Sequence, residues 1–556
     1  MLLSTAWQVL TGTQLIRNVG DLARFGALVF QILVPLELIV CVFLSAVLAA
    51  LAVAQEKDRH TLMLLLLSDL SAVELVLGEL FAGILGVLLL VVAAVPFLLL
   101  LTLLGGISLG QIGRSVAVIA MSVLACGSLG STLAFWREKT FQTLAIATLA
   151  MIFWTAAWEL VARNVAGRSW NGIATTDWAA TFSPWHAILQ AARPRPDNEL
   201  GAMSWARTTG GYLIVSLLAS SLLNLVAILR VRAWNSSPEV RPPAATAAAL
   251  DAAPSSGALP LPHHAARTRS VWSNPILWRE ACTWAYGRKV LAVRWAYLLL
   301  FVFVAYALQD LNSGPRLISR EEAALRLVPL FVLSLLLINA QSVTSITSER
   351  DGQSLDLLLV TDLTPKEFVY GKLAGVLYNT KEMVLLPAVL AVYLGASGTM
   401  SLENTGYLVV GWLTLAAFAA ILGIHAGMAY ASSRAAVSVS LGTLFFLFIG
   451  VATCMRIMVA FSGSFSFQLQ PFLAAMLGGF VGLYLALGAR NPSPAITAAA
   501  FFCPLATLYL LTSFLLGYTL AVFLVLVAAY GFTAAALLIP AIHEFDVATA
   551  RPPSEE

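Results

Sequence analysis

Two clusters of charged side chains, one in each half of the chain, are the strongest candidates for a functional site. The first begins at Glu56 and reads EKDR, and the second begins at Glu349 and reads ERD. Charges clustered in this way either complete a loop between two helices or form a docking surface for another protein. No side chains within the apolar segments match an acid–base or nucleophilic constellation. We therefore predict a binding or mechanical role and no catalytic residues.

The sequence contains no pattern for metal, redox or nucleotide chemistry. The cysteines form no CxxC pair, and four of them lie in apolar runs, where a thiol behaves as a small hydrophobe. The five cysteines are Cys41, Cys126, Cys282, Cys454 and Cys503. The sequence also lacks a GxxxxGK[ST] phosphate loop. We expect no metal, no cofactor and no disulfide, and we expect that this chain does not itself hydrolyse ATP.

The composition is that of a protein whose main solvent is lipid. Of the 556 residues, 59% are hydrophobic and 11% are charged, and the mean hydropathy is +0.86. An ordinary soluble domain carries about 25% charged residues. The net charge of +3 provides no basic excess for nucleic acid. The chain is therefore predicted to be a polytopic membrane protein in contact with the lipid bilayer.

Apolar runs of about 20 residues can cross a bilayer as helices, and this chain has about 12–13 of them. They lie near 27–54, 75–104, 111–136, 140–162, 208–230, 291–308, 327–347, 368–396, 408–430, 437–460, 467–488, 494–515 and 517–540. Lipid offers no hydrogen-bond partner to the backbone, and none of the runs shows the alternation of a membrane barrel. The predicted fold class is all-α, a polytopic transmembrane helical bundle.

The spans fall into two halves. Residues 1–233 form the first half and residues 271–545 the second. Residues 234–270 are rich in Pro, Ala and Ser and predict a flexible cytoplasmic linker, and 546–556 predict a disordered tail. The span at 291–308 has no counterpart in the first half, so we expect the first half to lack its first span.

An internal repeat relates the two halves. The stretch EKDRHTLMLLLLSDLSAVELVLGEL from Glu56 aligns without a gap with ERDGQSLDLLLVTDLTPKEFVYGKL from Glu349. A repeat in a membrane protein indicates pseudo-equivalent halves around a shared axis. Each copy predicts a charged turn, a short helix on the membrane face and a capped start of the next span. The predicted capping boxes are Ser71–Glu74 and Thr364–Glu367.

Basic residues gather in the loops on the same side as the charged clusters. Lys57 and Lys139 lie there in the first half, and Arg350 and Arg434 in the second. The alternate short loops GGISLG and GASGTMSLENTG hold no Lys or Arg. Because basic residues in short loops mark the cytoplasmic side, the clusters are predicted to face the cytoplasm.

Ionisable side chains inside apolar runs are further candidates, because a charge in lipid is costly. Glu37, Lys381 and Glu382 either line an in-membrane polar path or ion relay, or pair neighbouring helices. Both interpretations stay open for Glu37. For Glu159 and Arg456, near the ends of their runs, pairing or snorkelling is favoured.

Both copies of the repeat fit E-[KR]-D-x-x-[TS]-L-x-L-L-L-[LV]-[ST]-D-L-[ST]-x-x-E-x-x-x-G. This pattern resembles a loop of the type-two permeases of ATP-binding-cassette exporters. The segment NPILWREACTWAYGRK resembles the amphipathic helix that precedes the first span in that family. The chain departs from the family where His60 and Gln353 replace a common Gly. It departs again where Glu79 replaces the Lys that the second copy keeps as Lys372.

The resemblance implies a permease subunit, in a fused double-half form, of an exporter in a bacterial cytoplasmic membrane. It implies that each motif loop is a coupling helix docked on a separate ATP-binding-cassette ATPase, with two ATPase copies for the two halves. By residue-to-residue matching, the ATPase contacts are Glu56, Asp58, Thr61, Leu62, Glu349, Asp351, Ser354 and Leu355. The substrate is unknown.

Two other functions fit the sequence. An ion-gradient-driven secondary transporter would also have internal repeats and would use Glu37 or the Lys381–Glu382 pair during transport. A non-transporting membrane scaffold would dock other proteins through the linker and through the Trp-containing loop of the first half.

Overall fold

The computed structural model describes residues 19–103, 105–137, 139–165, 167–170, 172–194, 209–235, 272–282, 290–312, 320–359, 363–460, 465–488 and 493–548. This part of the chain is helical apart from loops and one small antiparallel sheet, which pairs β1 (Ser169–Trp170) with β2 (Ile173–Ala174). The prediction of an all-α polytopic bundle is confirmed.

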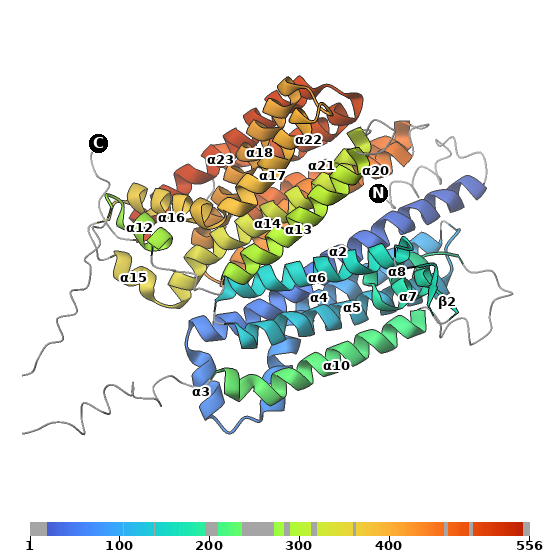
Figure 1. Cartoon of the computed structure of the whole chain (residues 1–556), viewed down its shortest axis with the longest axis horizontal. Helices are drawn as coiled ribbons and strands as arrows, with labels where there is room; N and C mark the ends of the chain where they lie inside the picture. Colours follow the sequence, from blue (N-terminus) through green and yellow to red (C-terminus); the bar gives the residue numbers. More distant parts are fainter. Residues whose placement is uncertain are drawn as a thin grey trace, which may run out of the picture.

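The first half contains five long helices and three short ones within the described residues. They are α2 (Val19–Asp58), α3 (Thr61–Leu67), α4 (Ala72–Thr102), α5 (Leu109–Trp136), α6 (Thr140–Ala162), α7 (Thr175–Phe182), α8 (Pro184–Ala191) and α10 (Thr209–Trp234). The short helices α7 and α8 fold back between α6 and α10, at the end of the bundle opposite α3 (Figure 1).

The second half begins with the short helix α12 and contains more spans than the first. Its elements are α12 (Pro275–Cys282), α13 (Val290–Asn312), α14 (Arg320–Asp351), α15 (Ser354–Leu359), α16 (Pro365–Asn379), α17 (Lys381–Ala396), α18 (Leu402–Ala429), α19 (Ser433–Phe445), the π-helical turn η3 (Phe446–Gly450), α20 (Val451–Ala460), α21 (Phe465–Leu487), α22 (Pro494–Leu516) and α23 (Thr519–Ala548).

The number of spans lies at the lower edge of the prediction. Eleven helices in the described residues are long and apolar enough to cross a membrane, and the α16–α17 pair makes twelve if it counts as one span. That pair is bent by 59° and was predicted as one continuous run at 368–396. The predicted run 467–488 corresponds to α21, of which Phe472–Leu487 forms only a shorter apolar helix.

The two halves repeat the same packing. In the first half α5 packs against both α2 and α10, and in the second half α18 packs against both α14 and α23. Figure 1 shows the halves as two bundles lying side by side, with the first half below and the second above. The contacts between the halves are reciprocal, since α2 touches α19 while α14 touches α6. A reciprocal contact of this kind is the signature of a two-fold arrangement.

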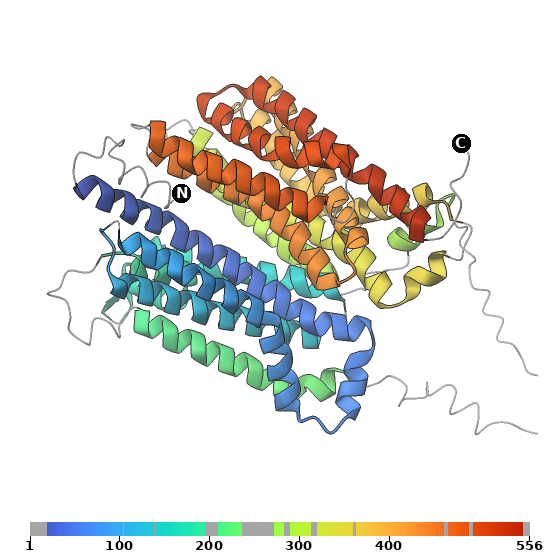
Figure 2. The same ribbon diagram turned by 180° about the vertical axis from the view of Figure 1, so that it is seen from behind.

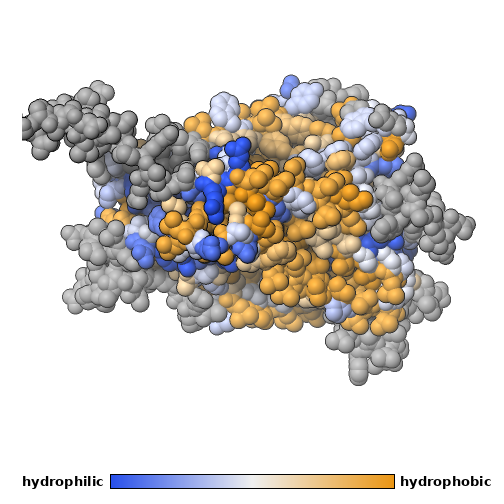
Figure 3. Space-filling view, turned by 90° about the horizontal axis from the view of Figure 1, so that it is seen from below, coloured by the Kyte–Doolittle hydropathy of each residue, from blue (hydrophilic) through white to orange (hydrophobic). Residues whose placement is uncertain are grey.

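The outer surface of the bundles is apolar, as lipid requires. On α4 and α10, Leu89 is 61% exposed and Leu222 is 63% exposed. Figure 3 shows a broad apolar area on one face, with the largest group of hydrophilic side chains toward the end that carries α3. In water such an area would drive aggregation, so these faces are lipid-facing.

Parts of the predicted domain plan fall outside the described residues. Residues 236–271, which include most of the linker predicted at 234–270, are not described, and neither are the tail residues 549–556. Trp234, the first residue of the predicted linker, is still the last residue of α10. Helix α23 runs to Ala548, so the start of the predicted tail, 546–548, is helical and that boundary was wrong. The described residues of the first half begin with α2, the counterpart of α14, and contain no counterpart of α13.

Candidate functional site: the repeated motif at the ends of the two bundles

Both charged clusters lie at one end of the molecule, where α2 and α14 finish. The short helices α3 and α15 follow, and then α4 and α16 begin; this end is on the left in Figure 1 and on the right in Figure 2. We call it the motif end. The structure confirms the predicted succession of a charged turn, a short helix and the start of the next span.

Both predicted capping boxes are present. The Glu74 backbone N–H donates to the Ser71 hydroxyl at 3.2 Å, and the Ser71 N–H donates to the Glu74 carboxylate at 2.9 Å. The equivalent distances between Thr364 and Glu367 are 3.2 Å and 3.0 Å. Pro365 occupies the first turn of α16, where its missing N–H has no intrahelical acceptor anyway. These local signals fix where α4 and α16 begin.

The basic residue of each cluster binds the end of a neighbouring span. Lys57 Nζ donates to the backbone carbonyls of Phe135 and Arg137, at 2.7 Å and 2.9 Å. In the second half, Arg350 donates to the carbonyl of Gly427 at 2.9 Å. These carbonyls lie at the C-terminal ends of α5 and α18, which carry unpaired acceptors and the negative end of the helix dipole. The cation therefore joins α2 to α5 and α14 to α18.

The second acid of each cluster holds the start of another span. The Thr140 hydroxyl, at the start of α6, donates to the Asp58 carboxylate at 2.8 Å. Ser433, at the start of α19, donates in the same way to Asp351. Arg59 then reaches across from the first half to Asp351, at 3.5 Å. The acids thus bind their own half together and also touch the boundary between the halves.

The hydroxyl that opens each short helix is anchored to the end of the preceding span. Thr61 donates to the backbone carbonyl of Glu56 at 3.1 Å, and Ser354 donates to that of Glu349 at 3.1 Å. Each motif therefore joins the short helix to the end of the preceding span, and the basic residue and the second acid join that end to two further spans of the same half.

Each short helix is preceded by a residue in the left-handed backbone region. His60 has a φ of 59° and Gln353 a φ of 55°. Side chains with a Cβ rarely adopt this region, whereas glycine does so without strain. A glycine would adopt this backbone conformation without strain at both positions, where this chain holds His and Gln.

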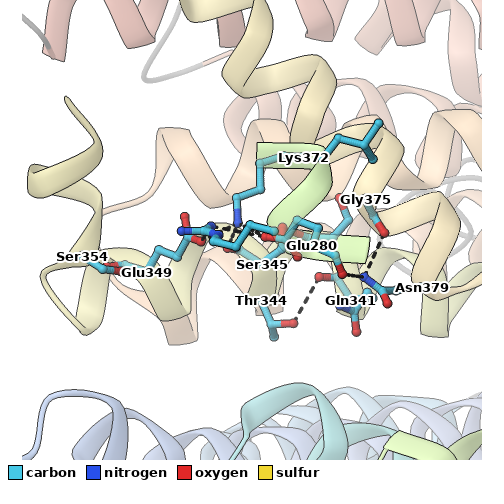
Figure 4. A network of polar contacts seen from close by, with 12 residues as sticks. Glu280, Gln341, Thr344, Ser345, Glu349, Ser354, Lys372, Gly375 and Asn379 are labelled. Carbon is cyan, nitrogen blue, oxygen red and sulfur yellow. Dashed lines mark hydrogen bonds and ion pairs between the residues drawn. The ribbon is translucent and has the colours of Figure 1, made fainter. Parts of the chain in front are cut away.

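A buried ion network surrounds the first acid of the second-half motif (Figure 4). The Lys372 side chain is 1% exposed, and its Nζ lies 2.6 Å from both Glu280 and Glu349. Arg279 pairs with the same two carboxylates. Although burial by itself lowers the pKa of Arg279, the carboxylates of Glu349 and Glu280 raise it above its ordinary value. Two cations and two anions are therefore matched between α12, α14 and α16.

The eight predicted ATPase contacts all lie at the motif end, but they do not form its outer surface. Leu62 is 3% and Asp351 8% exposed, and both point into the bundle. The other six are half-buried: Glu56, Asp58, Thr61, Glu349, Ser354 and Leu355. The exposed side chains of α3 are Leu64, at 67%, and Leu67, at 82%. Sequence reasoning did not single them out, although a run of four leucines on a short helix cannot be buried on all sides.

Lys381 and Glu382 do not pair with each other. They lie at the break between α16 and α17, where Arg294 of α13 approaches Glu382 to 3.5 Å. The Lys381 ammonium lies 4.6 Å from the centre of the Tyr378 ring. These contacts fit the pairing interpretation. Glu37 differs, because one of its carboxylate oxygens is buried and has no hydrogen-bond partner in the described part of the chain.

Other candidate residues have structural partners. Glu159 binds Arg163 at 2.9 Å and His186 at 3.0 Å, which agrees with the expected pairing, and Arg456 is exposed. Among the described residues, no group of three His, Cys, Asp or Glu side chains could hold a metal ion.

The halves meet at an apolar contact. The rings of Phe43 on α2 and Phe445 on α19 lie 4.6 Å apart between their centres. Within the second half, next to Phe445, a void of only about 10 Å³ lies between α14 and the α19–η3 segment. Its lining is apolar: Val332, Leu335, Leu336, Leu444, Phe445, Phe448 and Ile449. Across the boundary between the halves, the contact of Phe43 with Phe445 leaves the two helices closed against each other in this conformation.

Comparison of the chain with protein-family models, with curated proteins and with solved structures gave no match. The description of this protein therefore depends on its own sequence and structure. It is a multi-pass membrane protein whose two halves repeat the same packing and the same set of motif contacts.

Proposed function

We propose that this chain is the permease subunit of an ATP-binding-cassette exporter. The observation that carries the proposal is the way each motif joins a short helix to the end of one span, and that end to two further spans. A partner that moved α3 would pull on the end of α2 through Thr61, and that end would in turn pull on α5 through Lys57 and on α6 through Asp58. The same holds for α15 in the second half. Two short helices linked to the spans in this way could transmit a movement of a partner protein outside the membrane to the spans.

The docking surface would include the outer side of α3. Leu64 and Leu67 are exposed at the motif end, beyond the charged cluster that holds the helix in place. Exposed leucines of this kind mark an interaction site when they lie outside the lipid-facing spans. We assign the ATPase contact to these leucines, with the predicted charged residues acting as the anchor behind them.

The absence of a phosphate loop in the sequence supports a division of labour between two chains. ATP binding and hydrolysis would occur in the partner, and this chain would respond mechanically. The closed apolar contact at Phe43 and Phe445 would be the point that opens when the halves move apart.

The test is purification of the tagged chain in mild detergent, with mass spectrometry of the proteins that accompany it. We expect an ATPase with a phosphate loop, and we expect the Leu64→Asp, Leu67→Asp variant to lose it. The matched control is Leu64→Met, Leu67→Met, which keeps the apolar surface and should keep the ATPase. If the intact chain brings no ATPase even after crosslinking, the proposal is wrong.

Glu37 favours a second candidate, an ion-gradient-driven transporter. Its unpartnered buried oxygen is what a proton-carrying carboxyl in a span would have. This candidate predicts that the purified chain conducts protons in proteoliposomes and that Glu37→Gln abolishes the flux. If the intact chain conducts no protons, this candidate is excluded.

A further inference from the structure

The turns that follow α2 and α14 meet across the boundary between the halves. Figure 1 and Figure 2 show the ends of these two helices close together at the motif end. A guanidinium nitrogen of Arg59 lies 3.5 Å from the Asp351 carboxylate. In the opposite direction, the Ser348 side chain donates a hydrogen bond to the Asp58 carboxylate. The second acid of each motif is therefore in contact with the other half.

Asp351 is the buried member of the ion pair. Its side chain is 3% exposed, whereas Arg59 is half-exposed. Ser433 of the same half donates a hydrogen bond to Asp351, but a hydroxyl does not neutralise its charge. Among the described residues, the only ion pair of Asp351 is the one with Arg59. Because a buried carboxylate that loses its cation is destabilised, Asp351 favours the arrangement in which the first half supplies Arg59.

The charges around this contact come from both halves. Asp58 and Asp351 are close enough for their carboxylates to repel each other. Lys139 attracts Asp58, and both belong to the first half. Arg350 attracts Asp351, and both belong to the second half. Among the described residues, Arg59 therefore forms the one ion pair that joins the two halves and opposes the repulsion between their acids.

The repeat carries this cation in one copy only, because Arg59 aligns with Gly352. A Cβ at Gly352 would lie 3.8 Å from the Asp58 backbone carbonyl, so the second turn packs against the first half without bringing a charge to it. Glu79 and Arg434 also attract each other across the boundary, but they form no ion pair in the described structure. At this contact the first half supplies the cation and the second half supplies the buried acid.

The position of Arg59 connects the ion pair to α3. Arg59 lies two residues before α3, which begins at Thr61, so a displacement of α3 acts on the turn that carries the cation. The equivalent helix α15 begins at Ser354 and follows a turn that carries no cation. Asp351 itself belongs to α14 and is held by Ser433, so a displacement of α15 reaches it less directly.

We propose that the ion pair between Arg59 and Asp351 holds the two halves together at the motif end, and that α3, not α15, controls it. When α3 moves, Arg59 leaves Asp351, and the repulsion between the two acids then favours separation of the halves. The proposal makes the two repeated motifs functionally unequal. It concerns how the boundary is closed and does not depend on what drives the movement.

The reporter of an open boundary is Thr344→Cys in a chain without its five native cysteines. Thr344 is buried and lies four residues before Ser348, on the same face of α14. Figure 4 shows its side chain on the side of α14 toward the helices of the first half. The control reporter is Thr507→Cys, which is also buried but lies between α22 and α23, where Thr507 contacts Tyr530. The rate of reaction with a small maleimide is measured for each reporter in nanodiscs.

We expect Arg59→Gln to raise the reaction rate of Thr344→Cys about two- to fivefold, as for the loss of a half-exposed ion pair. Arg59→Lys keeps the charge and should stay close to the unchanged chain. High salt should raise the rate for the chain with Arg59 but not for Arg59→Gln, because salt screens the ion pair. No increase with Arg59→Gln, or an equal increase at Thr507→Cys, would overturn the proposal.

The control by α3 is tested with the two equivalent hydroxyls that anchor the short helices. Thr61→Ala loosens α3 and should raise the rate at Thr344→Cys, whereas Ser354→Ala loosens α15 and should not. In the Arg59→Gln background, Thr61→Ala should add nothing, because both changes act through the same contact. Equal effects of Thr61→Ala and Ser354→Ala would overturn the assignment of control to α3. The purified chain is used, so the result does not depend on whether an ATPase accompanies it.

Discussion

At the scale of single residues, the two copies of the motif differ most at one position, which is Lys372 in one half and Glu79 in the other. Lys372 is buried between two carboxylates, so its removal leaves Glu280 and Glu349 uncompensated except by Arg279. Breaking a buried pair from one side costs about 3–5 kcal/mol. The same substitution at Glu79 removes an acid with an unpartnered oxygen and should be neutral or stabilising.

The first prediction follows from this contrast. Lys372→Met should lower the thermal unfolding temperature in detergent, whereas Glu79→Met should not. Adding Glu280→Gln to Lys372→Met should restore part of the loss, because one of the orphaned carboxylates is then neutral. Equal behaviour of Lys372→Met and Glu79→Met would contradict the ion network described above.

The second prediction concerns the left-handed residues before the short helices. A side chain in this region costs about 1–2 kcal/mol, which glycine avoids at a smaller entropic cost. Gln353→Gly should therefore leave stability unchanged or raise it by up to about 1 kcal/mol. Gln353→Val, with its branched Cβ, should be destabilising. Chemical denaturation of the two variants side by side measures the difference, and a more stable Val variant would show that the assigned backbone is wrong.

Local features at this scale were predictable and tertiary ones were not. The capping boxes depend on residues three apart, and the sequence pattern located both. The burial of Asp351 depends on Ser433 and Arg59, which are far away in the chain. The charge pattern predicted a docking surface and the resemblance placed Asp351 on it, but neither could show these contacts. The exposure of Leu64 could not be predicted either, because it also depends on how α3 packs against residues far away in the chain.

At the scale of elements, the docking of α12 on α16 is the feature that distinguishes the halves. The third prediction tests this docking and uses the equivalent position of the first half as its control. Gly371→Ala places a Cβ against Asn274 and Ile276 and should loosen α12, whereas Gly78→Ala meets nothing. The readout is the rate of maleimide reaction at Cys282, the last residue of α12, with the other cysteines replaced. We expect a severalfold faster reaction for Gly371→Ala only; no difference would show that α12 does not pack there.

The break between α16 and α17 is a feature that the hydropathy of the sequence did not predict. The run 368–396 is mainly apolar but contains Lys372 and the polar stretch 379–382, which reads NTKE, and it was predicted as one helix. The chain breaks at Thr380, beside Arg294, which donates to the Asn379 carbonyl at 3.2 Å and pairs with Glu382. The polar stretch marks the place of the break, but the contact from α13 that stabilises it lies far away in the sequence.

At the scale of the whole molecule, the reciprocal contacts of α2 with α19 and of α14 with α6 form the boundary between the halves, which would move if the chain is a permease. Sequence repetition predicted two pseudo-equivalent halves, and the packing repeats accordingly. It did not predict which helices would meet, because α13 and the additional spans of the second half make the assembly asymmetric. The contact of Phe43 with Phe445 closes the boundary in the present conformation.

The most direct test of the permease account is whether ATP moves this contact. Phe43→Cys and Phe445→Cys are introduced into a chain without its five native cysteines, in membranes that contain its natural partners. A short bismaleimide should crosslink the pair without nucleotide. ATP with vanadate should reduce the yield severalfold, and Leu64→Asp with Leu67→Asp should abolish the ATP effect. A crosslink that forms equally well with and without ATP in these membranes would contradict the account.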